Sequence, residues 1–194
     1  MKKLLSFLPL LLTGCGTCEE VSLSPEERAL FAGYQEGTRL TFRSNRGHSN
    51  SFTVLPRQEW HENTRCNTPE AGRYQPIFTQ LVLRPATPYD DKHRDFVVNM
   101  RKSNPQRPGQ LAFSFAGLDC TTASQPGEPT AKLVLQPCTL TTTGQAYPAA
   151  YVFRQGQNAT NYGNGQLRAF YWDKQAGLIR YELADGEIFE RADY

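Results

Sequence analysis

Three histidines, His48, His61 and His93, are present in this chain of 194 residues, and histidine most often serves as the catalytic base near neutral pH. His61 stands between Trp60 and Glu62, so an aromatic ring, an imidazole and a carboxylate are adjacent in sequence. Nucleophilic catalysis also needs an activated serine or cysteine, and the G-x-S-x-G signature is absent. We therefore interpret His61 as a loop histidine and predict no catalytic residues.

A second group of chemically capable side chains lies within the six residues Asp90–Asp95, which contain three aspartates and a histidine. Hard cations bind several oxygen atoms that converge from one loop. The EF-hand spacing is missing, however, and Lys92 and Arg94 place positive charge among the carboxylates. We interpret this segment as a solvated charged turn and predict no metal site and no cofactor.

Three consecutive aromatic residues, Phe170, Tyr171 and Trp172, provide the strongest indication of a binding surface. Successive side chains of a strand point to opposite faces, so both faces of this strand carry rings. We expect one face to pack in the core and the other to expose an aromatic ledge that contacts a glycan, peptide or lipid. The alternative is a strand that is buried on both faces.

The N-terminus has the features of a signal peptide. Lys2 and Lys3 precede an apolar run, Leu4–Leu12, which is too short to cross a bilayer because a membrane-spanning helix needs about 20 residues. The run ends in Leu12-Thr13-Gly14-Cys15, which resembles the lipobox of bacterial lipoproteins. That resemblance implies cleavage before Cys15 and acylation of its sulfur and of the new amino group.

Membrane anchoring follows from this resemblance. Several acyl chains on Cys15 would hold the domain essentially permanently, since each buried methylene contributes about 0.8 kcal/mol. Residue 16 is glycine and not aspartate, which by the same resemblance implies the outer membrane, with a periplasmic or surface-facing domain. We therefore divide the chain into a signal peptide (1–14), a tether (15–23) and a single β-rich domain (24–194).

The composition excludes one large class of partner. Removal of residues 1–14 takes away Lys2 and Lys3, which leaves 19 basic residues against 19 acidic ones. A neutral mature chain without a basic stripe is not expected to bind nucleic acid. The predicted partners are the membrane, through the lipid anchor, and a glycan, peptide or lipid ligand.

Four cysteines, Cys18, Cys66, Cys120 and Cys138, remain if Cys15 is acylated. An even number in an oxidising compartment predicts two disulfides, for which three connectivities exist. We expect Cys120 to pair with Cys138, because each follows a strand-like segment and the two segments would form a hairpin. Elimination then pairs Cys18 with Cys66. A four-thiolate zinc site is the competing interpretation, and no C-x-x-C spacing supports it.

The elements that must position these groups are mostly strands. Ser24, Pro25 and Glu27 predict a helix start with a capping box, and Gly33 predicts the end of that helix. From Thr38 onward, apolar residues alternate with polar ones, and Gly/Pro turns recur about every 8–12 residues. We predict an all-β, mainly antiparallel fold: a sandwich, or an open or closed barrel, of about nine or ten strands with one short N-terminal helix.

The end of the chain predicts a three-stranded meander over residues 167–172, 178–183 and 187–191, with Asp185-Gly186 as a two-residue turn. The run Tyr171–Tyr181 together with this turn resembles the tail of small Gram-negative lipoproteins for which no activity is known. The resemblance therefore implies no particular activity.

Together these features predict a lipid-anchored cell-envelope protein with a non-enzymatic binding or structural role. The alternative is an envelope hydrolase that acts on cell-wall or polysaccharide material, with His61, Glu62 and the Asp90–Asp95 turn as its chemical groups. A cleft that brings these groups within hydrogen-bonding distance would favour the hydrolase, and a filled interior with the groups scattered would remove it. The ligand and the oligomeric state stay open.

Overall fold

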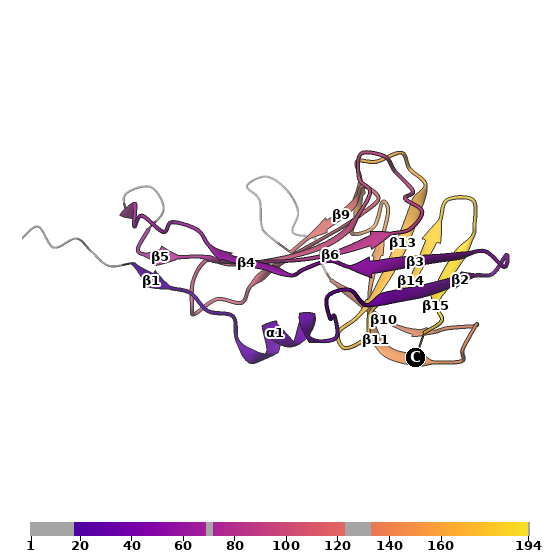
Figure 1. Ribbon diagram of the computed structural model, residues 1–194, viewed down its shortest axis with the longest axis horizontal. Helices are drawn as coiled ribbons and strands as arrows, with labels where there is room; N and C mark the ends of the chain where they lie inside the picture. The colour runs from indigo at the N-terminus through magenta and orange to yellow at the C-terminus, as the bar shows by residue number, and fades with distance from the viewer. Residues whose placement is uncertain (1–17, 69–71, 123–132, 194) are drawn as a thin grey trace, which may run out of the picture.

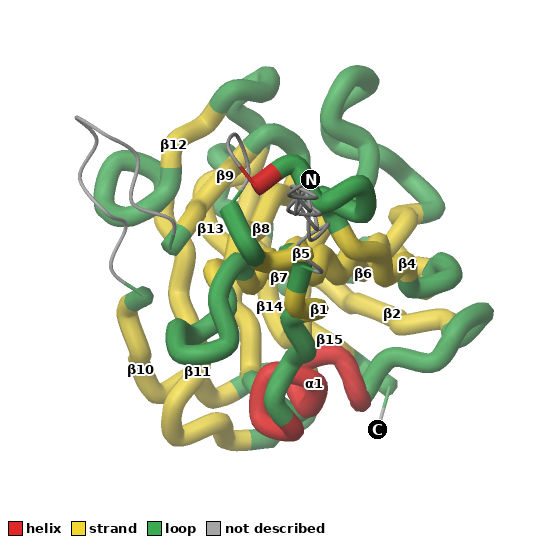
Figure 2. The backbone as a smooth tube through the Cα atoms, turned by 90° about the vertical axis from the view of Figure 1, so that its left-hand side faces the viewer, coloured by secondary structure: helices red, strands yellow, loops and turns green. Residues whose placement is uncertain are grey.

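A computed structural model describes residues 18–68, 72–122 and 133–193 of the chain. These residues form a mostly antiparallel sheet that curls into a half-barrel, with a single short helix, α1 (Pro25–Ala32), beside it (Figures 1 and 2). The predicted all-β class with one short helix is therefore confirmed. The segment Leu12–Cys15 lies outside the described residues.

Thirteen strands belong to the curled sheet. They are β2 (Arg39–Ser44), β3 (Ser49–Val54), β4 (Gln58–His61), β6 (Ile77–Pro85), β7 (Phe96–Lys102), β8 (Gln110–Phe115), β9 (Leu118–Thr121), β10 (Val134–Thr139), β11 (Ala146–Arg154), β12 (Thr160–Asn161), β13 (Leu167–Asp173), β14 (Gly177–Leu183) and β15 (Ile188–Arg191). Their order is β10-β11-β13-β14-β15-β2-β3-β6-β7-β8-β9-β12, and β4 pairs with β6 beside this path.

Short strands that the sequence pattern did not indicate raise the number above the predicted nine or ten. Strand β4 contains His61, which the sequence pattern had suggested was a loop residue. Two further strands, β1 (Glu19–Glu20) and β5 (Tyr74–Gln75), form a separate parallel pair. Val21 and Leu23 then enter the core, so residues 19–23, which we had assigned to the tether, belong to the fold.

Helix α1 begins and ends where the sequence predicts. The Ser24 hydroxyl accepts a hydrogen bond from the Glu27 amide, and the Glu27 carboxylate accepts one from the Ser24 amide, so the capping box is complete. Gly33 caps the other end, and Phe31 is buried in the core. Within the described ranges, no helix is long and apolar enough to span a membrane.

Aromatic rings fill the interior of the half-barrel. Phe113 on β8 lies 4.6 Å from Phe153 on β11, and Phe96 on β7 lies 5.4 Å from Phe170 on β13, measured between ring centroids. These contacts join opposite walls of the curled sheet. The described interior is therefore a packed core, as in a sandwich. The largest fully buried side chains include Trp172, Tyr181, Phe31, Phe42, Phe52, Phe96, Phe115, Phe153 and Phe170.

A second apolar cluster lies on the outer face of the sheet, under the β10–β11 hairpin. The turn of this hairpin crosses the neighbouring strands, because the amide of Thr142 donates a hydrogen bond of 2.9 Å to Glu190 on β15. The hairpin therefore covers the outer face of β13 and β14. The buried members are Cys138, Leu140, Tyr147, Ala150, Val152, Ala169, Tyr171 and Ile179.

The C-terminal strands form the predicted antiparallel meander, β13-β14-β15. Tyr34, two residues after the end of α1, contacts the first turn of this meander. Gly177 has a φ of +76°, and a Cβ atom at this position would overlap the hydroxyl of Tyr34. That hydroxyl accepts a hydrogen bond of 2.7 Å from the Leu178 amide. Glycine is therefore required at this position by both backbone conformation and space.

Candidate functional site

The residues considered for hydrolysis lie far apart. His61, at the end of β4, pairs with Ile77, the first residue of β6, whereas the Asp90–Asp95 turn follows the last residue of that nine-residue strand. A strand rises about 3.3 Å per residue, so the two groups are separated by roughly 25 Å. His61, Glu62 and the aspartates therefore do not form one catalytic site.

His61 and Glu62 each have a structural partner. The His61 Nε2 atom lies 3.0 Å from the Val21 carbonyl oxygen, which links β4 to the N-terminal segment. Glu62 forms an ion pair with Arg101, with 2.6 Å between the Glu62 Oε2 and Arg101 Nη2 atoms. His61 is thus a residue at a strand end that positions the backbone, not an exposed loop residue.

The Asp90 carboxylate organises its own turn. One oxygen accepts hydrogen bonds of 2.8 Å from the Lys92 and His93 amides, and the other accepts one from the Asn164 amide. The backbone hydrogen bond from His93 is the main cause that lowers the pKa of Asp90. Among the described residues, no three His, Cys, Asp or Glu side chains are grouped so that they could hold a metal ion.

The predicted Cys120–Cys138 disulfide is wrong, and Cys18–Cys66 is formed. Cys120 lies in the interior core, whereas Cys138 lies in the cluster under the β10–β11 hairpin, so the sheet separates the two sulfur atoms. The expected hairpin does not exist, because β9 pairs with β8 and β10 pairs with β11. Burial raises the pKa of the Cys120 thiol to about 11, which makes it a poor nucleophile.

The expected aromatic ledge on β13 is also wrong. Phe170 and Trp172 are buried in the interior, and Tyr171 on the other face lies under the β10–β11 hairpin. The Tyr171 hydroxyl donates to Glu182 and accepts from Arg154, each at 2.7 Å. Burial raises the pKa of Tyr171 to about 12. The strand is buried on both faces, which was the alternative interpretation.

An exposed aromatic pair lies instead on β4 and β6. Trp60 is 41% exposed, although its ring stacks on Phe78 with centroids 4.5 Å apart and planes inclined by 29°. The two residues are direct partners in the antiparallel register. Among the described strands β4 pairs with β6 alone, so Trp60 lies on an edge strand of the sheet.

The strand register surrounds this pair with polar side chains on the same outer face. Across β4, β6 and β7, Trp60 pairs with Phe78, which pairs with Arg101. Two residues along the strands, Gln58 pairs with Gln80, which pairs with Asn99. The Gln80 amide donates a hydrogen bond of 3.0 Å to Asn99. We call this surface the outer platform, and it comprises Gln58, Trp60, Phe78, Gln80, Asn99 and Arg101.

The outer platform is electrically balanced. Its one charged member, Arg101, is paired with Glu62, and both side chains remain about two-fifths exposed at 42% and 39%. The platform therefore combines two stacked rings with amide donors and acceptors but has no net charge. Such a surface can bind a flat, neutral ligand that carries hydroxyl groups.

A groove of about 570 Å³ provides a second concave surface, between the β10–β11 hairpin and the β13–β14 turn. Leu135 is exposed beside it, but Tyr147 is buried and the Lys174 ammonium lies over the Tyr151 ring at 5.5 Å. The groove therefore offers a ligand no open aromatic face, and the outer platform is the better candidate.

The sequence contains a weak signal for the outer platform. Trp60 stands two residues after Gln58, and this spacing fits one face of a strand. The prolines at positions 56 and 69 made the surrounding segment resemble a loop. The pairing with Phe78 depends on the strand register, which cannot be read from the local pattern.

Comparison of the chain with models of known families, with curated proteins and with solved structures finds no match. The chain's own residues are therefore the basis for the function proposed below.

Proposed function

We propose that this chain is a lipid-anchored protein of the cell envelope, attached through Cys15, that binds a neutral glycan on the outer platform. One observation carries the proposal: the Trp60 ring stays 41% exposed while Phe78 holds it in position. A large aromatic ring left open on a sheet surface is a feature of binding sites.

The stacked pair suits a sugar ring. A pyranose has a face of C–H groups, which packs on an aromatic ring, and hydroxyl groups around its edge. Because Phe78 already fixes the Trp60 ring, little side-chain entropy is lost when a ligand binds. The stacked pair therefore provides a preformed apolar surface for one sugar ring.

The polar members of the platform suit the hydroxyl groups. Gln58, Gln80 and Asn99 offer both donors and acceptors, as does the Arg101–Glu62 pair. Their zero net charge favours a neutral glycan over an acidic one. The filled interior gives no support to an internal lipid ligand.

The disulfide supports the proposed location. Cys18, three residues beyond Cys15, is joined to Cys66, and disulfides persist mainly in oxidising compartments such as the periplasm and the cell surface. The separation of His61 from the Asp90–Asp95 turn leaves the hydrolase alternative without an assembled set of groups.

Titration with neutral oligosaccharides tests the binding proposal. Chitohexaose and maltohexaose are added while the heat of binding is recorded by isothermal titration calorimetry, a signal that does not depend on Trp60 as its reporter. We expect a saturable change that Trp60→Ala abolishes and that Tyr162→Ala, which removes another exposed aromatic ring, preserves. Equal binding by Trp60→Ala, or no binding to either oligosaccharide, would contradict the proposal.

Fractionation of cells tests the location. We expect the parent protein in the membrane fraction and Cys15→Ser in the soluble fraction. Cys120→Ala is the matched control, because it also removes a cysteine but leaves the predicted anchor. If Cys15→Ser associates with the membrane as strongly as the parent protein, the result would contradict the proposed anchor.

A further inference from the structure

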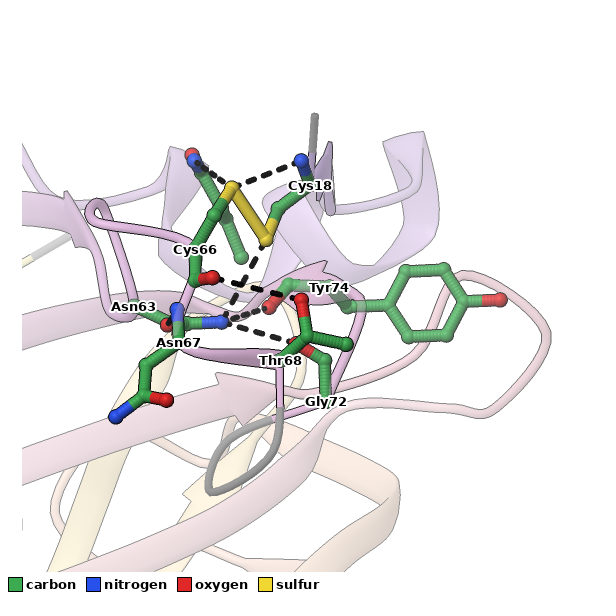
Figure 3. Close-up of a disulfide and its surroundings, with 8 residues drawn as sticks. Cys18, Asn63, Cys66, Asn67, Thr68, Gly72 and Tyr74 are labelled. Carbon is green, nitrogen blue, oxygen red and sulfur yellow. Dashed lines mark hydrogen bonds between the residues drawn. A yellow bond between two sulfur atoms is a disulfide. The ribbon is translucent and has the colours of Figure 1, made fainter. Parts of the chain in front are cut away.

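The chain is held tightly from Cys18 onward (Figure 3). Besides the disulfide, the Cys18 amide lies 2.8 Å from the Cys66 sulfur. The next residues join β5, because the Glu19 amide donates to the Arg73 carbonyl oxygen at 3.0 Å and the Val21 amide donates to that of Gln75 at 3.1 Å. Cys18 therefore cannot move independently of the domain.

The segment that carries Cys66 is itself fixed. The Asn63 side-chain amide donates hydrogen bonds to the carbonyl oxygens of Gly72 and Tyr74, at 3.1 and 3.0 Å. Val21 is fully buried, and its carbonyl oxygen lies 3.0 Å from His61 on β4. Cys18 is therefore connected rigidly to the main sheet on both sides.

We propose that this end of the domain lies directly against the phospholipid headgroup layer in which Cys15 is inserted, an inference that rests on the proposed acylation. Cys15 precedes Cys18 by three residues, and an extended chain spans at most about 3.6 Å per residue, so the tether reaches about 11 Å. The headgroup layer on one side of a bilayer is roughly 5–8 Å thick. Little length remains to lift the domain away from the headgroups.

The side chains at this end suit a headgroup layer. Arg65, Arg73 and Arg107 are exposed, and the Arg73 guanidinium lies 4.9 Å from the Tyr74 ring centroid. The Tyr74 hydroxyl lies 3.5 Å from Gln106, which brings the loop containing Arg107 to the same end. Guanidinium groups bind phosphate oxygens, and tyrosine rings are enriched at membrane interfaces.

Charge at this end is balanced. In sequence, Arg65, Arg73 and Arg107 are matched by the carboxylates of Glu19, Glu20 and Glu70, and the nearby pair of Arg101 with Glu62 is neutral. Net repulsion from anionic headgroups therefore does not oppose the approach, and the short tether is what imposes the orientation.

The shape of the domain then fixes its orientation. Figure 1 shows β1 and β5 at one end of the longest axis and the β2–β3 turn at the opposite end. If the first end lies on the membrane, the β2–β3 turn must project away from it. A long flexible tether would instead let both ends approach the bilayer.

Energy transfer to the membrane tests this orientation. A donor dye is attached to Gln106→Cys or to Arg46→Cys, since Cys120 and Cys138 are buried and stay unlabelled. The mature acylated chain is reconstituted in phosphatidylethanolamine/phosphatidylglycerol vesicles that contain an acceptor-labelled lipid. We expect stronger transfer from position 106 than from position 46. Insertion of a flexible Gly/Ser linker of about twelve residues after Gly16 should lower the transfer from position 106 and remove the difference.

The outcomes separate the two proposals. Equal transfer from both positions in an acylated chain, or no effect of the linker, overturns the orientation and leaves the anchor intact. A chain whose mass shows no acyl group overturns the anchor and, with it, this inference.

Discussion

Cys18 and Cys66 are joined by a disulfide that spans 48 residues of sequence, and their Cα atoms lie 5.4 Å apart. The bond ties the N-terminal segment to the loop before β5. Because it restricts the unfolded chain over this long span, we expect Cys18→Ser/Cys66→Ser to lose about 2–4 kcal/mol of unfolding free energy. Guanidinium unfolding measures the loss. Unfolding of the parent protein in the presence of reductant is the control, because it breaks the same bond without a substitution, and a double variant as stable as the oxidised parent would contradict the prediction.

The Glu27 carboxylate lies 2.9 Å from the Lys102 ammonium, and both side chains are largely buried. Glu27 also accepts hydrogen bonds from the Ser24 and Gly109 amides. Glu27→Gln leaves Lys102 without its charge partner, so we expect a loss of about 3 kcal/mol of unfolding free energy. Glu26→Gln changes an exposed neighbour and should have little effect, and equal effects of the two substitutions would refute the argument.

Glu27 also predicts a dependence on acid. Burial opposes ionisation, but the hydrogen bonds from Ser24 and Gly109 and the charge of Lys102 outweigh it and lower the pKa below the ordinary 4.5. The stabilisation is therefore complete above pH 4.5 and is lost as the pH falls through the lower pKa of the folded state. Thermal unfolding between pH 2 and pH 7, compared with Glu27→Gln, should show a smaller acid-induced loss in the variant.

The two free cysteines predict a specific pattern of thiol reactivity. Cys120 and Cys138 are buried, and burial raises the pKa of both thiols. In the mature chain, whose Cys15 is acylated under the proposed anchor, we expect no rapid reaction with a thiol reagent in the native protein and two reactive thiols in guanidinium without reductant. Absence of reactive thiols in guanidinium would show that Cys120 and Cys138 are bonded after all.

Tyr171 is the centre of a polar network under the β10–β11 hairpin. Its hydroxyl contacts Glu182 and Arg154, and burial is the main cause that raises its pKa to about 12. The folded state favours the neutral phenol, so this stabilisation is present below about pH 10 and is lost as the pH rises through 12. Tyr171→Phe should cost about 1–3 kcal/mol at neutral pH and reduce the alkaline loss. An unchanged unfolding profile between pH 9 and pH 12 would exclude this role.

Local sequence patterns predict the local elements well. Ser24, Glu27 and Gly33 determine α1 through contacts within the helix and its caps, and Asp185-Gly186 determines a tight turn. These signals involve residues close in sequence, so they are readable without the fold. The alternating pattern likewise predicts the all-β class.

The features that the sequence did not predict depend on contacts between strands that are distant in sequence. One face of the strand that carries Phe170, Tyr171 and Trp172 was expected to be exposed, because its pattern gives no sign that the β10–β11 hairpin folds over Tyr171. Cys120 and Cys138 were expected to pair because their flanking segments resembled a hairpin, whereas each joins a different partner strand. The Trp60–Phe78 stack likewise depends on the β4–β6 register. These features follow from strand order, which local propensity does not encode.

Mass spectrometry of the N-terminal peptide, released from the protein purified from membranes, tests the proposed anchor most directly. The account predicts a peptide that starts at Cys15 and carries acyl groups on the cysteine. The Cys18–Cys66 disulfide should be recovered in the same digest without reductant. A peptide that starts elsewhere, or an unmodified Cys15, would contradict the account.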